Sequence, residues 1–209
     1  LSVYFLLDCS TSMAMAPPAT RTLFERALQV TAALSYISLS NLDRVAVVPF
    51  STTIGRPGRS LRSKGQFFRI LRQLSALQCS GQTEICDALK AFARHRPRRG
   101  LVVLVSDFYD PRGVDDGLRY LRYRGYESMV LQLTDKRILD AEHWGDLVLV
   151  DCESGQTREL CLTPELMKAY TQEFEAFSGR IAAAAREVGA RYLQVDVGQR
   201  FDEIVMKVF

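Results

Sequence analysis

Three short polar segments of the chain carry oxygen-bearing side chains that could act together as metal ligands. In the first, D-C-S-T-S, Asp8, Ser10 and Ser12 fall at every second position. The second, S-G-Q-T-E, contains Thr83, and the third, S-D-F-Y-D, contains Asp107. Two carboxylates and three hydroxyls form an all-oxygen set, which suits a hard cation such as Mg²⁺, with Mn²⁺ or Ca²⁺ as alternatives. The sequence therefore predicts a metal site.

Each segment also has a plainer explanation when it is taken alone. The side chains of Asp8 and the serines that follow it are typical of a turn that bonds to its own backbone. Thr83 is a common type of helix N-cap, with Glu84 favoured in the first turn by the helix dipole. Asp107 would cap a loop after a strand. The metal hypothesis depends on the three segments meeting.

The hydrophobic pattern indicates a fold in which they do meet. Apolar runs predict strands at 1–8, 44–50, 101–108, 127–135 and 191–197, a hairpin over 146–162, and helices from Thr20 onward and at 67–77, 81–95, 114–125, 164–188 and 201–209. This alternation predicts one α/β domain, 1–209, with a Rossmann-like, mainly parallel sheet, helices on both faces and a β-hairpin insertion. Function in such folds lies at the carboxyl ends of the strands, where Asp8 and Asp107 fall.

Several local features refine this prediction. Thr20 is expected to be the N-cap of the first helix. Pro49 argues that its strand is an edge strand or bulged, and Gly179 could kink the long helix. The hairpin is expected to turn at Glu153 to Gln156, where Cys152 and Cys161 could face each other.

The combined pattern resembles the von Willebrand factor A (VWA) domain and its metal-ion-dependent adhesion site (MIDAS). That family places D-x-S-x-S after the first strand, a threonine in a later loop and an aspartate after the fourth strand. The resemblance implies metal ligands at Asp8, Ser10, Ser12, Thr83 and Asp107. It also implies that a partner protein's Asp or Glu completes the metal's coordination, with no catalysis.

A narrower resemblance is to bacterial VWA-like proteins called domain of unknown function family 58. It is carried by "DCSTSM", "VVLVSDFYD", the hairpin "VDCESGQTREL" and the helix "LMKAYTQEFEAF". That family often has membrane segments ahead of the domain and is typically encoded beside MoxR-type AAA+ ATPases. The resemblance implies a role with such an ATPase in protein assembly or maturation.

Three residues depart from the usual VWA pattern. Phe108 stands where many adhesion domains have glycine, and with Tyr109 it could narrow access to the metal. Asp110 is a spare carboxylate that could replace or supplement Asp107.

Two other functional classes remain open from the residues. A metal-dependent hydrolase or phosphatase could use the same pocket, but no general base is obvious because His95 and His143 lie outside the three segments. Cys9 lacks a following arginine and phosphate-binding loop, which argues against a nucleophile. A structural scaffold with a vacant site is the other alternative.

Composition excludes several further classes. The net charge of +3 and the lack of aromatics among the basic loops, Arg56–Lys64 and Arg94–Arg99, argue against nucleic acid. A solvated surface at the ends of helices is the plainer explanation of those loops, and an acidic partner surface or anionic lipid is the functional alternative. No apolar run is long enough to span a membrane. Since the chain starts inside a strand-like run, it is expected to be a fragment of a longer protein, with any membrane anchor outside it. It is expected to be a cytoplasmic domain. Met13 and Met15 are core residues or, if exposed, an apolar rim.

Overall fold

A five-stranded parallel sheet forms the centre of the molecule. The computed structural model describes residues 1–16, 20–55, 58–95, 98–136, 145–152 and 155–208. The sheet contains β1 (Ser2–Asp8), β2 (Arg44–Phe50), β3 (Leu101–Ser106), β4 (Glu127–Thr134) and β7 (Arg191–Asp196), in the order β2-β1-β3-β4-β7. All four strand pairs are parallel. The α/β fold with a mainly parallel sheet is confirmed.

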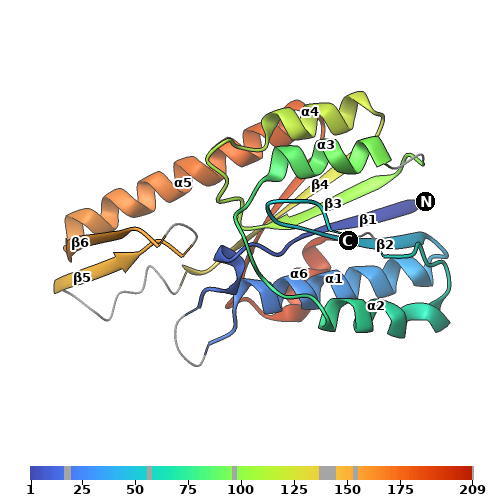
Figure 1. Cartoon of the computed structure of the whole chain (residues 1–209), viewed down its shortest axis with the longest axis horizontal. Coiled ribbons are helices and arrows are strands. Elements are labelled where there is room, and N and C mark those ends of the chain that lie inside the picture. Colours follow the sequence, from blue (N-terminus) through green and yellow to red (C-terminus); the bar gives the residue numbers. More distant parts are fainter. Residues whose placement is uncertain (17–19, 56–57, 96–97, 137–144, 153–154, 209) are drawn as a thin grey trace.

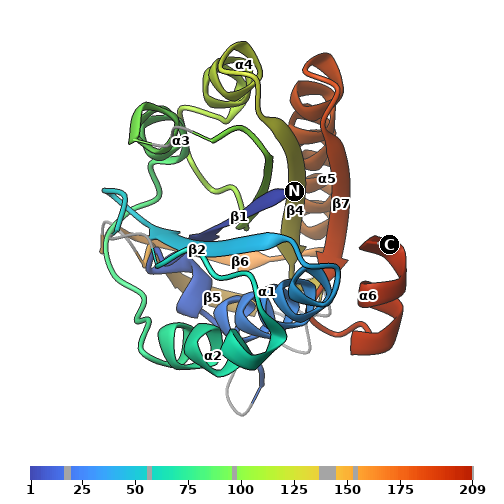
Figure 2. The same cartoon turned by 90° about the vertical axis from the view of Figure 1, so that its right-hand side faces the viewer.

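Helices cover both faces of this sheet. One face carries α1 (Leu23–Ser40), α2 (Phe67–Ser75) and α6 (Phe201–Val208), and the other carries α3 (Ile85–His95), α4 (Asp115–Tyr123) and α5 (Pro164–Glu187) (Figure 2). A separate antiparallel pair, β5 (Gly145–Val150) and β6 (Thr157–Leu162), forms the predicted hairpin. The hairpin and the start of α5 extend beyond the sheet on the side where its strands end (Figure 1). α5 continues through Gly179 without interruption.

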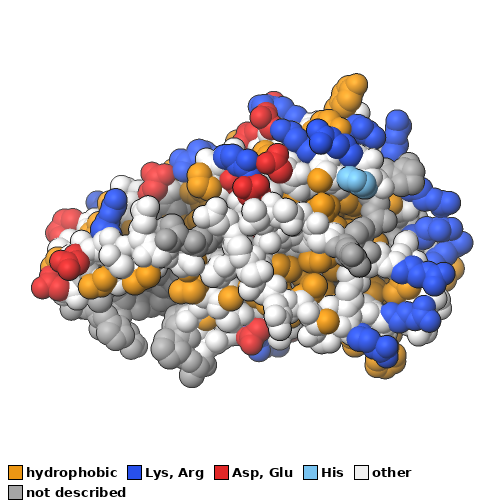
Figure 3. Space-filling model, in the orientation of Figure 1, with side chains coloured by type: hydrophobic (Ala, Val, Ile, Leu, Met, Phe, Trp, Pro, Cys, Tyr) orange, Lys and Arg blue, Asp and Glu red, His pale blue; other side chains and the backbone are white. Residues whose placement is uncertain are grey.

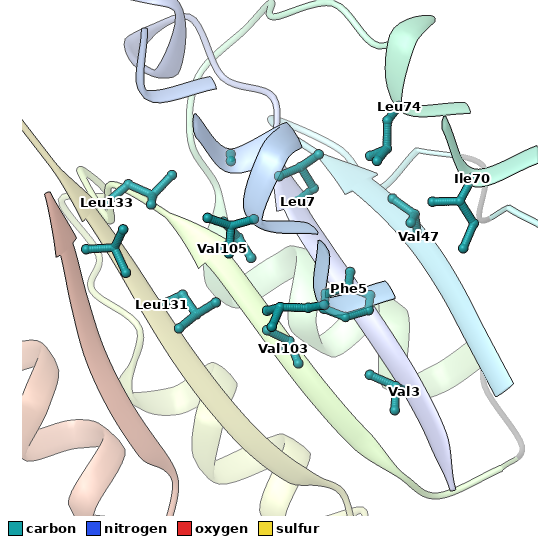
Figure 4. Packing of buried hydrophobic residues seen from close by; sticks show 14 of the residues in the cluster. Val3, Phe5, Leu7, Val47, Ile70, Leu74, Val103, Val105, Leu131 and Leu133 are labelled. Atoms are coloured by element: carbon teal, nitrogen blue, oxygen red, sulfur yellow. The ribbon is translucent and has the colours of Figure 1, made fainter. Parts of the chain in front are cut away.

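Strand β1 is apolar along its length because it is buried on both faces. Val3, Phe5 and Leu7 enter the core under α1, together with residues of β3 and α2 (Figure 4). Tyr4 and Leu6 enter the opposite core under α3 and α4. Such two-sided burial removes the polar alternation of a half-exposed strand. Asp8 is the first charged residue of the strand and comes at its end.

Strand β2 is an edge strand, as Pro49 predicted. A proline donates no hydrogen bond, so the sheet tolerates it there. The following segment covers part of this edge through isolated bridges from Leu61 to Val45 and from Ile54 to Phe50. These bridges do not make a further strand. Among the described residues, Asp107 therefore follows the third strand, whereas the VWA pattern places it after the fourth.

The start of α1 corrects one prediction. Thr22 is the N-cap, because its hydroxyl accepts a bond from the Glu25 amide at 3.0 Å and the Glu25 carboxylate accepts one from the Thr22 amide at 3.3 Å. This reciprocal pair is a capping box. The prediction of Thr20 is wrong because the box requires a Glu three residues after the cap.

The two hairpin cysteines do not face each other. Cys161 pairs with Asp146 in the β5–β6 register, whereas Cys152 lies in the turn beyond the last pair, Val150 and Thr157. Neither cysteine forms a disulfide bond within the described part of the chain. Of the predicted turn, Glu153 lies outside the described residues.

Candidate metal centre

The loop after β1 and the loop that contains Thr83 are held together by backbone hydrogen bonds. The Ser80 amide donates to the Cys9 carbonyl at 2.8 Å, and the Thr11 amide donates to the Gly81 carbonyl at 3.0 Å. The Thr11 hydroxyl donates to the same carbonyl at 3.1 Å. The Cys9 amide in turn donates to Phe50 at the end of β2. Two of the three predicted segments thus meet at the carboxyl edge of the sheet.

Gly81 is required at the centre of this junction. Its φ of +77° is a backbone conformation that residues with a side chain rarely adopt. A Cβ at this position would also lie 2.7 Å from the Thr52 hydroxyl oxygen. That hydroxyl accepts a bond from the Gln82 amide at 3.0 Å, which fixes the residue before Thr83. The glycine therefore lets the loop approach closely enough to place Thr83.

The third segment joins the first through Asp8. The Ser106 hydroxyl donates to Asp8 Oδ2 at 2.6 Å, and the Ser10 amide donates to Asp8 Oδ1 at 2.9 Å. Ser106 also accepts a bond from the Phe108 amide at 2.8 Å. It therefore fixes both the Asp8 carboxylate and the turn that carries Asp107.

Ser106 is a residue of the site that was not predicted from the sequence. A buried serine next to a candidate ligand at the end of a central strand is a signal that could have identified it, because a buried hydroxyl requires a partner.

Four of the five predicted ligands are almost inaccessible to solvent. Asp8 and Ser10 are fully buried, and Asp107 and Thr83 are 1% and 3% exposed. Ser12 is partly exposed, and its hydroxyl lies 3.1 Å from that of Ser10. Asp107 Oδ1 accepts a bond from the Tyr109 amide at 3.0 Å. The structure thus brings the three segments that carry the predicted ligands to one buried location.

The electrostatics of this location suit a cation. Burial and then the negative charge of Asp107 raise the pKa of Asp8 from 3.8 to about 7, and hydrogen bonds from Ser106 and Ser10 act in the opposite direction. None of these influences is a cationic side chain. Two buried carboxylates that repel each other are stabilised when a positive ion lies between them. The donor set contains only oxygen, so it fits Mg²⁺ or Mn²⁺.

Phe108 occupies a backbone conformation that favours glycine. Its φ is +68°, a strained value for a residue with a side chain, costing on the order of 1–3 kcal/mol. The ring is 2% exposed and packs in the core beneath α3 and α4, which offsets this strain. A ring inside the core cannot cover the site, so the prediction that Phe108 narrows access is wrong.

Tyr109 remains beside the site at the surface. Its ring is 45% exposed and stacks on Phe177 of α5, with ring centroids 5.4 Å apart and planes at 11°. Desolvation, followed by the charges of Tyr170 and Asp107, raises the pKa of its hydroxyl. Met15 is 54% exposed after the first loop, whereas Met13 is fully buried. Met15 and Tyr109 are thus the apolar residues available to a partner here.

Asp110 has a structural role at the start of α3. One of its carboxylate oxygens accepts a bond from the Ile85 amide and the other from the Arg112 amide, both at 2.8 Å. It therefore caps α3 from a different segment. α3 begins at Ile85, two residues after Thr83, and the role of Thr83 as its cap stays a prediction.

The nucleophile reading of Cys9 finds no support in its surroundings. Burial, and then the charge of Cys79, raise the pKa of the Cys9 thiol to about 12, so the reactive thiolate is disfavoured. His95 bonds to the Ala91 carbonyl within its own helix, away from the site. His143 lies outside the described residues.

Two further features of the described part of the chain concern its metal ligands and its helices. No three His, Cys, Asp or Glu side chains gather there as metal ligands, so the candidate site depends on hydroxyls in addition to its two carboxylates. No described helix is long and apolar enough to cross a membrane.

Solved structures with similar folds confirm the VWA-like architecture. A conserved hypothetical protein, BatB, from Bacteroides thetaiotaomicron has a TM-score of 0.61 at 14% identity, covering 100% of this chain and 95% of that one. The VWA domain of SpRpn10 has a TM-score of 0.53 at 12% identity, covering 100% and 94%. An aerotolerance-related membrane protein from Bacteroides fragilis has a TM-score of 0.59 at 17% identity, covering 100% and 96%. At these identities the likeness concerns the fold alone.

The sequence relatives are matched over only part of their own length. An uncharacterized protein of Mycobacterium tuberculosis is 25% identical over 198 residues, which cover 93% of this chain and 62% of that protein. An uncharacterized protein of Mycobacterium avium is 30% identical over 110 residues, 53% of this chain and 64% of that protein. The chain thus spans less than two thirds of these relatives. Residues 1–178 match one family model, and the chain belongs to that family, the proteins of unknown function DUF58.

Proposed function

We propose that this chain is a Mg²⁺-dependent protein-binding module. The observation that carries the proposal is the convergence of three loops on a buried pair of carboxylates, Asp8 and Asp107. Among the described residues, no cationic side chain contributes to the pKa of Asp8. Asp8, Ser10, Ser12, Thr83 and Asp107 would hold the ion, some of them through water. The bound ion would supply a positive charge that attracts a carboxylate.

The recognised group would be an Asp or Glu side chain of another protein. The two carboxylates equal the formal charge of a divalent ion, but a carboxylate that coordinates through water and shares its charge with hydrogen bonds leaves residual positive charge on the ion, and the hydroxyl ligands are neutral. Ser12 is the partly exposed member of the set and marks the side from which a partner approaches. Met15 and Tyr109 would pack against apolar parts of that partner.

Binding of displayed random peptides tests this module directly. In Mg²⁺, the chain should enrich peptides that contain Asp or Glu, and replacement of that acidic residue by Asn or Gln should abolish binding, because the neutral amide gains little from the cation. The Asp8→Ala variant should enrich none of them. The proposal would be wrong if the enriched peptides lacked carboxylates or bound Asp8→Ala equally well.

The companion that we propose is a MoxR-type AAA+ ATPase, acting with this chain in protein assembly or maturation. The support is the DUF58 family match together with the sequence resemblance on which that partnership rests. Since such an ATPase needs Mg²⁺ itself, binding should be compared between wild type and Asp8→Ala at constant Mg²⁺. Absence of binding to the ATPase would remove this partner and leave the peptide result unaffected.

Catalysis is not part of the proposal. A hydrolase would need a base near the ligands. The buried Cys9 thiol, with its raised pKa, and His95, bonded within its own helix, do not supply one. Phosphatase turnover that disappears in Asp8→Asn would overturn this part of the proposal.

A further inference from the structure

The end of the molecule opposite the candidate metal centre is strongly basic. At this end the sheet strands begin, and Lys and Arg side chains gather there in the space-filling view, at the right of the picture (Figure 3). We call this surface the basic end. Its exposed members are Arg59, Arg62, Lys64, Arg94, Arg98, Arg99, Arg122 and Arg124. They come from segments that are far apart in the sequence.

Specific contacts bring the first of these segments to the start of the sheet. Leu61 exchanges two backbone hydrogen bonds of 2.8 Å with Val45, near the beginning of β2. The neighbouring Arg62 side chain donates to the Leu42 carbonyl at 3.3 Å. The positions of Arg59, Arg62 and Lys64 are therefore fixed by their attachment to this edge.

The second group is joined to the same edge through β1 and α4. The Tyr4 hydroxyl, near the beginning of β1, donates to the Arg98 carbonyl at 3.1 Å. The Gly100 carbonyl accepts a bond from Glu127 at the start of β4. The ends of α3 and α4 meet near Tyr120, whose hydroxyl accepts a bond from Arg124 at 3.3 Å and whose pKa is lowered by both Arg94 and Arg124.

The positive charge of this surface is barely compensated within the chain. Among the described residues, none of the eight side chains forms an ion pair with a carboxylate. Two acidic residues lie close by, Asp43 just before β2 and Glu127 at the start of β4. A dense set of unpaired cations on one surface favours an anionic partner.

Exposed apolar side chains accompany these cations. Leu42, Phe68 and Tyr123 are 66%, 76% and 84% exposed. Leu42 precedes β2, Phe68 lies at the start of α2 after Lys64, and Tyr123 is the last residue of α4, between Arg122 and Arg124. Basic residues interspersed with single large apolar residues are typical of surfaces that contact a lipid interface. Binding of single-stranded nucleic acid would instead use aromatic platforms on which successive bases stack.

We propose that the basic end binds the surface of an anionic lipid bilayer. The guanidinium and ammonium groups would contact lipid phosphates, and Leu42, Phe68 and Tyr123 would enter the headgroup layer. The contact lies within residues 1–209 and needs no membrane-spanning helix. Because the candidate metal centre lies at the other end of the strands, it would face away from the bilayer and remain open to a partner (Figure 1).

Vesicle co-sedimentation of the 1–209 chain tests this inference. Phosphatidylcholine vesicles that contain one third phosphatidylglycerol should bind the protein in EDTA, and pure phosphatidylcholine should not. Binding should weaken steeply between about 0.1 M and about 1 M NaCl, because the Debye length falls from ~10 Å to ~3 Å. EDTA removes divalent metal ions. The vesicle contact requires no metal, so its measurement in EDTA is independent of the proposed metal-dependent function.

A pair of charge reversals provides the matched comparison. Arg98→Glu with Arg122→Glu should weaken vesicle binding by at least about thirtyfold, since each basic residue near an anionic surface contributes ~1 kcal/mol. Arg158→Glu with Lys168→Glu changes the net charge equally on the hairpin and α5 and should have little effect. All four side chains are exposed.

Three results would overturn the inference: equal binding to both vesicle types, equal loss in both double variants, or no binding to anionic vesicles by wild type. If wild type failed to bind vesicles but bound a short DNA or RNA duplex with strong salt dependence, the basic end would be a nucleic-acid surface. The salt and lipid comparisons use wild type alone, so they hold even if a variant misfolds.

Discussion

Replacement of Asp8 by alanine is expected to lower Mg²⁺ affinity by at least about a hundredfold. Asp8 supplies one of two buried carboxylates in the candidate site, and removal of one charged partner of a buried pair typically costs about 3–5 kcal/mol. The same change should raise the thermal stability of the metal-free protein at pH 8, because it removes the repulsion between Asp8 and Asp107 that raises the Asp8 pKa. Calorimetric titration and thermal unfolding in EDTA measure the two effects.

Asp196 offers a matched control for this variant. It is also the last residue of a parallel strand, and its carboxylate accepts bonds from the Gly198 and Lys136 amides at 2.7 and 2.9 Å. Asp196→Ala should lose some stability and keep the Mg²⁺ affinity of wild type. Equal metal affinity in wild type and Asp8→Ala would contradict the assignment.

The stabilisation by Mg²⁺ should increase with pH. The Asp8 pKa is raised from 3.8 to about 7, so between these values the folded, metal-free protein holds a proton that the unfolded chain has lost. The stability of the metal-free protein therefore falls as pH rises from about 4 to about 7. Mg²⁺ must displace that proton, so its apparent affinity should rise by about tenfold per pH unit up to about pH 7 and then level off.

Ser106→Ala should move this pH profile upward. The Ser106 hydroxyl donates to Asp8 at 2.6 Å and lowers its pKa, opposing burial and Asp107. Without it, the affinity should keep rising to a higher pH than in wild type. Ser35→Ala, which removes a buried hydroxyl of α1 outside the site, should leave the profile unchanged. A flat profile in wild type would mean that Asp8 is ionised throughout and would refute the competition between proton and metal.

Much of the fold was predictable because periodicity reflects burial. The apolar run of β1 predicted a two-sided buried strand, and Pro49 predicted the edge strand, since each follows from a local physical constraint. The start of the first helix could also have been predicted. Thr20 and Thr22 are equivalent by residue type, but only Thr22 has a glutamate, Glu25, three residues later, which is the sequence signature of a capping box.

The candidate site, like the fold, could be predicted from the sequence only in part. Asp8, Ser10 and Ser12 could be predicted to lie together from their spacing, and the carboxyl ends of parallel strands predicted the approach of Asp107. Ser106 and Asp110 could not be assigned, because their roles depend on hydrogen bonds across 98 and 25 residues of sequence. Sequence spacing does not encode such long-range pairing. The left-handed conformation of Phe108 was likewise hidden, since the residue type argues against it.

The most direct test of the metal centre is to locate the ion. A crystal grown with Mn²⁺ and measured for anomalous scattering should show one strong peak enclosed by Asp8, Ser10, Ser12, Thr83 and Asp107, and the same peak should be missing in Asp8→Ala. A map with no peak between Asp8 and Asp107, or with its main peak elsewhere on the chain, would contradict the proposed metal-dependent function.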